Sequence, residues 1–402
     1  MKYVVVLGDG MADEPIEQLG GKTPLSYAKT PTMDALAKVS EVGLVHTIPE
    51  GMKPGSDTAN LAVIGYNPRE YYTGRSPLEA LSIGVDMKAT DIAIRCNIVT
   101  VSDDDLPYEE KTIVDHSSSE ISTEDAAVLL EAVRKELEND IYKYYLGTSY
   151  RHLTIWDKGE VVDLTPPHDI LGKVIGDYLP KEDALREMMK KSYDVLNNHP
   201  LNVERAKKGF NKANSIWFWG AGTRPALDSF ESKNHKRGAM ISAVDLLKGI
   251  AVGASMKVIE VEGADGTLHT NYEGKAKAAL NVLLEDDYDF VYVHVEAPDE
   301  MGHQGSIPNK IEAIESLDEK VIRIIKEGME KAGADYRMLV MPDHPTPIRC
   351  RTHTSDPVPY MLYDSRKPID NNGLYDEKYA KESGICREDG YTLINKLLEN
   401  EK

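Results

Sequence analysis

Three short apolar segments of the chain each run directly into a carboxylate. They are "YVVVLGDG", which reaches Asp9, "DFVYVHVEAPDEMGH", which reaches Asp299, and "YRMLVMPDH", which reaches Asp343. Such segments are typical of parallel strands in an open α/β sheet, where ligands collect beyond the carboxyl ends of the strands. We therefore expect an α/β core with a mainly parallel sheet and with the three carboxylates at its strand ends.

The segment between two of these strands predicts a helix that flanks the sheet. In "KIEAIESLDEKVIRIIKEGMEKAG", apolar residues recur at spacings of three and four, which is the period of an amphipathic helix. Gly333 ends the segment and suits the C-terminal end of a helix. The apolar positions are Ile311, Ile314, Leu317, Val321 and Ile324.

The middle of the chain has a different pattern. There "STEDAAVLLEAVRKELEND" predicts a helix, and "KYYLGTSYRHLTIWDKGEVVDL" is typical of a hairpin. At 402 residues the chain is also too long for one ordinary hydrophobic core. We therefore expect an inserted α+β domain over residues 95–236 and one core domain formed by residues 1–94 and 237–402.

The net charge limits the class of partner. The formal net charge is -20, so the surface repels phosphate backbones and we expect no nucleic-acid partner. A small anionic substrate then needs a local cationic pocket. The apolar segment "IAIRCNIVTV" is too short to cross a bilayer and contains Arg95, so we expect no membrane partner either.

The N-terminal sequence and the cysteines indicate in which cellular compartment the protein is expected. The chain begins with "MKYVVVLGDG", without the charged and apolar regions typical of a secretion signal, and we expect a cytoplasmic location. The cysteines are odd in number and widely scattered, which argues against a disulfide framework or a thiolate metal cluster. They are interpreted as buried or incidental thiols and are Cys96, Cys350 and Cys386.

Several residues near the expected strand ends have the chemistry of metal ligands. Asp299 and His303 would share one face if the chain turns into a helix there, because they are four residues apart. Asp343 and His344 are adjacent, and in a loop beyond a strand their side chains can diverge toward two neighbouring ions. Each pair alone favours a structural role. Together they favour a metal centre with the candidate ligands Asp9, Asp299, His303, Asp343, His344 and His353.

A Gly-Ser-Asp sequence precedes an apolar helical pattern in "EGMKPGSDTANLAVIGYNP". Ser56 or Asp57 would be an ordinary N-cap of that helix. A nucleophile gains from the same position, because free N–H groups and the helix dipole stabilise a developing alkoxide and an attached phosphate. The segment alone favours capping, with the nucleophile as the alternative.

Taken in order, these segments resemble the metal-dependent alkaline phosphatase superfamily. They are more closely similar to the archaeal-type branch of the cofactor-independent phosphoglycerate mutases. The resemblance covers nearly the whole chain and implies an alkaline-phosphatase-like core with an inserted substrate-binding or lid domain. It is carried by "GDGMADEPIEQLGGKTPLSYAKTPTMDALA", "PGSDTANLAVIGYNP", "YYTGRSPLEA", "SYRHL", "TPPHDI", "NYEGKAKAA", "HVEAPDEMGHQG", "PDHPTP" and "RTHTSDPVP".

The resemblance implies a site for two divalent metal ions. The ligands of one ion would be Asp9, Ser56, Asp343 and His344. The ligands of the other would be Asp299, His303 and His353. Mixed carboxylate and imidazole ligands suit Mn²⁺ or Zn²⁺ better than Ca²⁺, and Mg²⁺ would be a catalytic substitute.

The resemblance also implies a reaction on a small, anionic, phosphorylated substrate. Ser56 would attack the phosphoryl group of a phosphoglycerate while the metals neutralise phosphate oxygens. The phosphoserine would then transfer this group to the other hydroxyl of the bound glycerate. In this way 3- and 2-phosphoglycerate would be interconverted without 2,3-bisphosphoglycerate, provided that the inserted domain excludes water.

Three residues are candidate substrate contacts. Arg151 in "SYRHL" can bind a carboxylate through two guanidinium nitrogens. Lys275 in "NYEGKAKAA" resembles the family lysine near the transferred phosphate, and His116 in "IVDHSSSE" is a candidate for proton transfer or substrate clamping. A surface salt bridge or a satisfied histidine is the alternative role. His294, inside an apolar run, is expected to be a core residue or to support the ligands.

Other functions are compatible with parts of this pattern. The segment "DHSSSE" departs from the arginine-containing "DRRAG"-like segment of many archaeal-type mutases, which is compatible with a homoserine kinase-like phosphotransferase that uses a nucleotide donor. The chain, however, has no Gly-rich P-loop. A non-catalytic metal-binding protein would have lost a ligand or the nucleophile. Plain phosphatase or sulfatase activity fits the ligands, but the large insertion favours controlled transfer.

Overall fold

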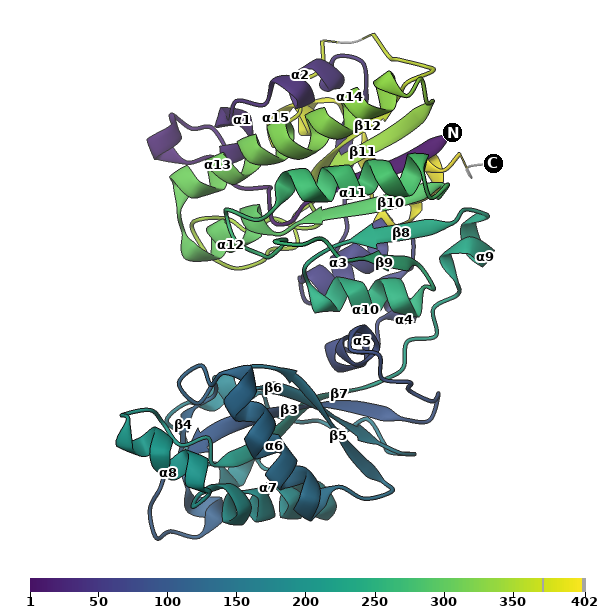
Figure 1. The fold of residues 1–402 in the computed structure, drawn as a ribbon. Coiled ribbons are helices and arrows are strands. Elements are labelled where there is room, and N and C mark those ends of the chain that lie inside the picture. Colours follow the sequence, from purple (N-terminus) through teal and green to yellow (C-terminus); the bar gives the residue numbers. More distant parts are fainter. Residues whose placement is uncertain (371, 400–402) are drawn as a thin grey trace. The chain divides into compact units, whose positions relative to one another are not determined.

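The computed structural model describes residues 1–370 and 372–399 and divides into two compact units (Figure 1). The first unit consists of Met1–Tyr72 and Ala226–Lys402, and the second of Thr73–Pro225. The second unit is thus inserted in the sequence of the first. Its limits differ from the expected 95–236 at both ends.

Two segments near the boundaries account for this difference. Helix α5 (Arg75–Ser82) belongs to the second unit, where its Glu79 accepts a hydrogen bond from Arg95 at 2.9 Å. The segment after Pro225 belongs to the first unit, where the ring of Phe230 stacks on that of Phe290 at 4.7 Å. The amphipathic pattern of such segments predicts that they pack against a sheet, but it does not specify which sheet.

The first unit is built on an eight-stranded sheet with the order β13-β2-β12-β11-β1-β10-β8-β9. Neighbouring strands are parallel except at β12, which is antiparallel to both of its neighbours. The predicted mainly parallel sheet is therefore confirmed. The strands are β1 (Lys2–Gly8), β2 (Glu41–Val45), β8 (Gly238–Ile241), β9 (Lys257–Ile259), β10 (Phe290–Val295), β11 (Tyr336–Met341), β12 (Val358–Asp364) and β13 (Cys386–Arg387).

Strand β1 lies between β10 and β11 and pairs in parallel with both. The register places Leu7 beside His294 on one side and beside Met341 on the other. All three strands are almost entirely buried, as expected for apolar, β-branched runs in a parallel sheet. Their carboxyl ends coincide, so the residues that follow them lie at one edge of the sheet.

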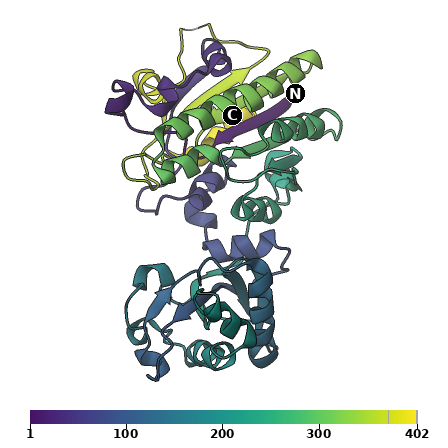
Figure 2. The same cartoon turned by 60° about the vertical axis from the view of Figure 1, so that its left-hand side comes forward.

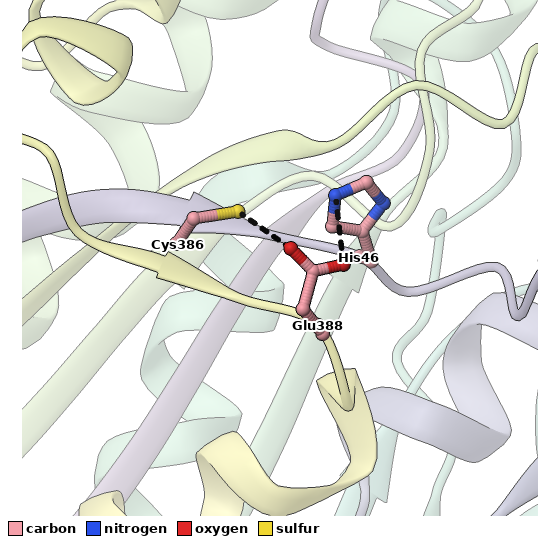
Figure 3. Close-up of side chains that lie close together, drawn as sticks. All are labelled: His46, Cys386 and Glu388. Atoms are coloured by element: carbon pink, nitrogen blue, oxygen red, sulfur yellow. Dashed lines mark hydrogen bonds and ion pairs between the residues drawn. The ribbon is translucent and has the colours of Figure 1, made fainter.

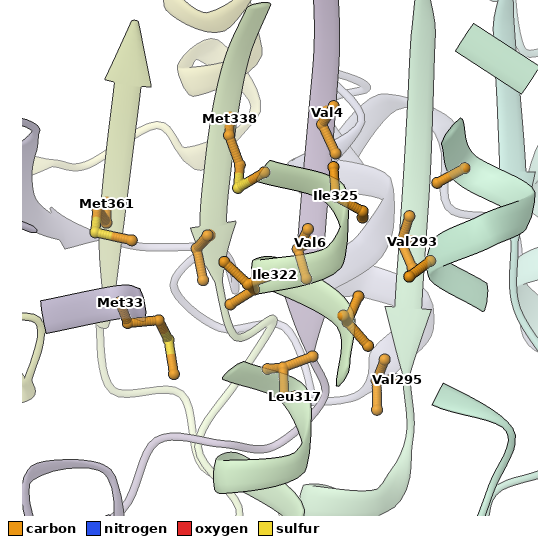
Figure 4. Packing of buried hydrophobic residues seen from close by; sticks show 14 of the residues in the cluster. Val4, Val6, Met33, Val293, Val295, Leu317, Ile322, Ile325, Met338 and Met361 are labelled. Atoms are coloured by element: carbon orange, nitrogen blue, oxygen red, sulfur yellow. The ribbon is translucent and has the colours of Figure 1, made fainter. Parts of the chain in front are cut away.

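Helices α13 (Ile307–Leu317) and α14 (Arg323–Lys331) lie along this sheet (Figure 2). A π-helical turn, Asp318–Ile322, joins them into one helical segment. The helix predicted within residues 310–333 is confirmed, and Gly333 follows it with a φ of 63°. The side chains at this contact include Leu317, Ile322, Ile325, Val4 and Val6 (Figure 4).

The second unit contains a five-stranded sheet in which every pairing is antiparallel. Its strands are β3 (Ile92–Val101), β4 (Ile113–Asp115), β5 (Tyr142–Thr148), β6 (Arg151–Trp156) and β7 (Ser215–Thr223). Strand β3 pairs with both β6 and β7, and its whole length is buried. The predicted hairpin is β5 with β6, and the helix predicted from "STEDAAVLLEAVRKELEND" is α6 (Thr123–Leu137).

The remaining helices are short or moderate in length. Those of the second unit are α7 (Asp183–Leu196) and α8 (Pro200–Lys207). Those of the first unit are α1 (Pro24–Tyr27), α2 (Pro31–Ala37), α3 (Ser56–Val63), α4 (Pro68–Tyr71), α9 (Phe230–Asn234), α10 (Asp245–Gly253), α11 (Tyr272–Leu284), α12 (Ala297–Gln304), α15 (Glu377–Glu382) and α16 (Leu393–Leu397). No helix within residues 1–370 and 372–399 has both the length and the apolar content needed to span a membrane.

Candidate metal centre

The first unit gathers three carboxylates beyond the ends of neighbouring strands. Asp9 follows β1, and Asp343 follows β11. Asp299 lies in the first turn of α12, which begins directly after β10. The chain does turn into a helix at "DEMGH", the condition under which the two residues share one face, and Oδ2 of Asp299 lies 3.2 Å from Nε2 of His303.

Four predicted ligands face one another on one side of this cluster, which we call the inner half: Asp9, Ser56, Asp343 and His344. Nε2 of His344 lies 3.2 Å from Oγ of Ser56. The same nitrogen lies 3.4 Å from Oδ2 of Asp343 and 3.6 Å from Oδ1 of Asp9. Asp9 is 4% exposed, and Asp343 and His344 are fully buried.

The inner half concentrates negative charge in a buried position. Burial and the charges of Asp343 and Asp299 raise the pKa of the Asp9 carboxyl well above its ordinary value. Within the described residues, no donor forms a hydrogen bond with the buried Oδ1 of Asp9. Burial lowers the pKa of His344, which favours a neutral imidazole with a lone pair to donate. These donors fit a divalent cation.

The other three predicted ligands form the outer half: Asp299, His303 and His353. Nε2 of His303 lies 3.0 Å from Nε2 of His353, which in turn lies 3.5 Å from Oδ1 of Asp299. Nδ1 of His303 is 2.9 Å from Arg351 O, which can only accept. Nδ1 therefore carries a hydrogen, and Nε2 is the nitrogen that can bind a metal once its own proton has left. Two imidazole nitrogens at this separation suit one shared ion.

The outer half is held by mutual attraction between its groups. The hydrogen bond to Asp299 raises the pKa of His303 to about 9. Against the effect of burial, hydrogen bonds from His303 and His353 hold the pKa of Asp299 well below its ordinary value. A cation would take the place of the proton between these groups, since ligand nitrogens must be unprotonated.

Three residues that the sequence analysis did not single out position these ligands. Asn60 donates from Nδ2 to Oδ2 of Asp343 at 2.8 Å, and the Thr346 hydroxyl donates to Oδ1 of Asp299. Gly10 donates its N–H to Oδ1 of Asp343 at 3.1 Å. Its φ is 59°, and a Cβ atom there would lie 2.5 Å from Oδ1 of Asp299. Their only signal in the sequence is that they stand close to predicted ligands.

His294 supports the inner half from within β10. Its Nε2 lies 3.0 Å from Oδ2 of Asp9, and its Nδ1 lies 3.0 Å from Oε1 of Glu296. Against the effect of burial, the carboxylates of Glu296 and Asp9 raise the pKa of His294 to about 10. Both nitrogens of His294 contact carboxylates, which favours a role in orienting Asp9 over binding an ion, the supporting role considered from the sequence.

Lys275 has a different setting from that expected of a substrate contact. Its side chain extends from α11 and is fully buried. Nζ donates to Oε2 of Glu296 at 2.6 Å and to His294 O at 2.8 Å. Lys275, Glu296 and His294 thus form a buried chain of contacts that ends at Asp9, which we call the support network.

Ser56 is the first residue of helix α3, whose N-cap is Gly55. No side chain makes a cap hydrogen bond at this helix end, and Asp57 accepts instead from the N–H of Thr58 at 2.9 Å. The Ser56 hydroxyl is directed to His344. The geometry therefore favours the nucleophile over the N-cap interpretation that the segment alone suggested.

The second unit brings two predicted substrate contacts to one aromatic ring. The guanidinium of Arg151, an exposed residue, lies 5.1 Å from the ring centre of Tyr150. The ring of His116 meets Tyr150 edge-on at 5.7 Å and lies 6.2 Å from the ring of His168. We call these four residues the Tyr150 surface.

The segment "DHSSSE" forms a tight loop beside the Tyr150 surface. The Asp115 carboxylate accepts hydrogen bonds from the N–H groups of Ser117 at 2.8 Å and Ser119 at 2.6 Å. It also accepts from Nδ2 of Asn211 at 2.9 Å. These hydrogen bonds hold the loop around the Asp115 carboxylate. The loop sequence contains the His116 imidazole but no arginine.

The sequence was compared with known proteins. A family model described as 2,3-bisphosphoglycerate-independent phosphoglycerate mutase matches residues 37–202. The chain is 48% identical to a probable 2,3-bisphosphoglycerate-independent phosphoglycerate mutase of Geobacter sulfurreducens, over 99% of this chain and 100% of the relative. It is 49% identical to the 2,3-bisphosphoglycerate-independent phosphoglycerate mutase of Methanosarcina barkeri, with the same coverage.

Solved structures with a similar fold cover the whole chain. A protein from Pyrococcus horikoshii matches with a TM-score of 0.82 and 30% identity, over 100% of this chain and 99% of the other. The cofactor-independent phosphoglycerate mutase of Thermoplasma acidophilum matches with a TM-score of 0.67 and 26% identity, over 100% of both. Near-complete coverage at almost half identity places the chain in one family with the relatives above. The chain belongs to the 2,3-bisphosphoglycerate-independent phosphoglycerate mutases.

Proposed function

We propose that the chain interconverts 3- and 2-phosphoglycerate without 2,3-bisphosphoglycerate, through a phosphoserine on Ser56. The observation that carries this proposal is the position of the Ser56 hydroxyl, 3.2 Å from Nε2 of His344 in the inner half. The full-length relatives in Geobacter and Methanosarcina carry the name of this activity, which supports the same assignment.

We assign two divalent cations to the two halves of the centre. The ligands of the first are Asp9, Ser56, Asp343 and His344. The ligands of the second are Asp299, His303 and His353. The mixture of oxygen and nitrogen donors favours Mn²⁺ or Zn²⁺, with Mg²⁺ as a substitute. When bound, the cations supply positive charge to the phosphate oxygens and lower the pKa of the Ser56 hydroxyl.

Ser56 forms the covalent intermediate in the proposed reaction. Its Oγ loses a proton and attacks the phosphorus of 3-phosphoglycerate, while the bond from phosphorus to the glycerate oxygen breaks and that oxygen takes a proton. The 2-hydroxyl of the retained glycerate then attacks the phosphoserine, loses its proton, and releases Ser56 as the free hydroxyl. The N–H groups of the first turn of α3 stabilise the phosphoryl oxygens in both steps.

We assign the substrate carboxylate to the Tyr150 surface, so that the second unit has a substrate-binding role. The exposed guanidinium of Arg151 lies near the Tyr150 ring, and the N–H groups at the edge of its plane can donate to a carboxylate. His116, at the same ring, is a second contact of the substrate. Lys275 is assigned to the support network, because its ammonium already has two buried acceptors.

A direct test is to incubate metal-loaded protein with 3-phosphoglycerate alone and follow 2-phosphoglycerate by phosphorus NMR. We expect product without added 2,3-bisphosphoglycerate or ATP, and none with Ser56→Ala. If only a parallel reaction with homoserine and ATP gives phosphorylated product, the mutase assignment is wrong. The relatives named above do not favour that alternative. Hydrolysis of generic phosphate esters without isomerisation would retain the metal chemistry but reject the transfer.

The role of the Tyr150 surface has its own test. Arg151→Ala should raise KM for 3-phosphoglycerate at least tenfold, because a hydrogen-bonded charge contributes roughly 1.5–3 kcal/mol. Arg186→Ala is the matched control, since Arg186 belongs to the same unit and pairs with Asp183 on α7. Equal KM values for the two variants would remove Arg151 from the substrate site.

A further inference from the structure

Three residues with different metal-binding groups meet at one edge of the eight-stranded sheet (Figure 3). His46 directly follows β2, Cys386 begins β13, and Glu388 directly follows β13. The two strands pair in parallel, with Cys386 beside Leu44, and the N–H of His46 donates to Arg387 O at 2.9 Å. The backbone register thus holds the three side chains together, and none of them belongs to the metal centre.

The separations suit a tetrahedral ion. Nε2 of His46 lies 3.6 Å from Oε2 of Glu388, and Sγ of Cys386 lies 3.8 Å from Oε1 of Glu388. One ligand atom from each of the three residues lies within 4.8 Å of the others. Bond lengths of about 2.3 Å for Zn–S and 2.0–2.1 Å for Zn–N and Zn–O give tetrahedral edges of about 3.4–3.6 Å.

The direct contacts between these groups are weak. A separation of 3.6 Å between nitrogen and oxygen exceeds that of a good hydrogen bond, and a thiol is a poor donor. The three groups are therefore close without satisfying one another. An ordinary cysteine thiol is protonated at neutral pH, so Cys386 holds a proton when no cation is bound.

An ion can reach this cluster from a cavity. His46 and Glu388 line a cavity of about 640 Å³, together with Arg69, Asp389 and Tyr391. The cavity provides space for a water molecule or an anionic donor as a fourth ligand. Three protein ligands with one open position form a coordination pattern that zinc accepts.

We propose that His46, Cys386 and Glu388 form a third cation site, separate from the two-metal centre and specific for borderline-soft ions such as Zn²⁺. The sulfur–metal bond forms as the thiol proton leaves to solvent, so that one proton is released for each ion bound. Thiolate and imidazole donors select Zn²⁺ over Mg²⁺ and Mn²⁺, whereas the ligands of the metal centre are oxygen and nitrogen only. A bound ion would connect His46 at the end of β2 to Cys386 and Glu388 of the β13 segment.

Cobalt separates this site from the metal centre, because only a thiolate ligand gives sulfur-to-cobalt charge-transfer absorption in the near ultraviolet. Full-length protein freed of metal by chelation would be titrated with Co²⁺ until all sites are filled. We expect the absorption in the wild type and its loss in Cys386→Ser. His46→Ala should weaken Co²⁺ binding at this site at least tenfold. One equivalent of Zn²⁺ beyond the two of the metal centre should abolish the band.

Cys350→Ser is the matched control, because Cys350 is the other thiol with solvent access among the described cysteines. This variant should keep the band and three Zn²⁺ ions per chain, against two in Cys386→Ser. All variants should keep wild-type mutase activity in excess Mn²⁺, which verifies their fold. An absent band in cobalt-saturated wild type, or a band that persists in Cys386→Ser, would overturn the proposal. So would equal zinc contents in the two serine variants.

Discussion

The two halves of the candidate metal centre both combine carboxylate and imidazole groups, but they do so in different surroundings. In the inner half, the side chains of Asp343 and His344 are fully buried. In the outer half, the side chains of His303 and His353 are 35% and 24% exposed. The inner ligands Asp9, Asp343 and His344 follow the central strands of the sheet, whereas the outer histidines lie at the end of α12 and in the loop before β12. These three inner ligands therefore belong to the core, and the two outer histidines lie nearer the surface.

The supports of the two halves differ accordingly. Asp9 is oriented by the support network, in which an ion pair between Lys275 and Glu296 lies entirely in the interior. His303 is oriented by one backbone carbonyl. Breaking a buried charge network destabilises a protein more than removing a single partly exposed hydrogen bond does. The inner half should therefore be rigid and slow to exchange, and the outer half easier to empty and refill.

The largest expected difference between the two halves should follow from replacing Ser56, the proposed nucleophile of the inner half. Ser56→Ala should lower kcat at least about a thousandfold, because in the proposed mechanism it removes the covalent step altogether. The outer half should still bind its ion, since it shares no ligand with Ser56. Activity would be followed by formation of 2-phosphoglycerate and ion binding by calorimetry. Near-normal turnover would reduce Ser56 to a residue at the helix end.

Stepwise removal of metal would compare the halves directly. Titration with a chelator should remove the outer ion first, because its ligands are partly exposed. His303→Ala should eliminate the weaker step with a loss of affinity greater than about a hundredfold, while His344→Ala should affect the tighter step. Elemental analysis at each chelator concentration gives the two occupancies. Simultaneous loss of both ions in wild type would contradict the distinction between the halves.

Substitutions inside and outside the support network should differ in their effect on the stability of the protein. Lys275→Ala removes one of the two cationic partners of the buried Glu296, the other being His294, and we expect a loss of about 3–5 kcal/mol in the free energy of unfolding. Lys277→Ala, two residues later on α11, removes an exposed pair with Glu273 and should change it by less than about 1 kcal/mol. Denaturant unfolding of metal-free protein measures both. Similar losses would show that the network is not structural.

A smaller effect should appear in the pH dependence of metal-free protein. The pKa of Asp9 is raised on folding, so between the unfolded value of about 3.9 and the folded value the native state binds more protons. Its contribution to stability therefore falls as pH rises through this range. Asp9→Asn cannot ionise and should show a shallower decline in melting temperature with rising pH in the presence of a chelator. Parallel curves for both proteins would contradict the assignment.

The strand-end ligands could be predicted because they depend on local pattern. Apolar β-branched runs specify β1, β10 and β11, and parallel pairing brings the residues after them together. The four-residue spacing of Asp299 and His303 needs only a helical turn. The contacts of Asn60 and Thr346 could not be predicted in the same way, since they depend on how separate segments meet across the fold.

The choice between roles also needed tertiary contacts. Ser56 has the same local sequence whether it caps α3 or faces His344, and only the position of His344 separates the two roles. Lys275 resembles the family lysine near the transferred phosphate, but the sequence does not show that its ammonium forms a hydrogen bond with Glu296 in the interior. Helix α5 was assigned to the wrong unit because an amphipathic pattern does not identify the surface that it covers.

The position of β1 in the sheet has a consequence for synthesis on the ribosome. Its two neighbours, β10 and β11, begin at residues 290 and 336, so β1 has no partner until these much later segments are synthesised. At about 5–20 residues per second, this interval lasts from about 15 seconds to about a minute. The second unit is continuous in sequence and can fold during that time. The nascent chain therefore carries an exposed apolar strand for a long period, which is a site where chaperones would bind.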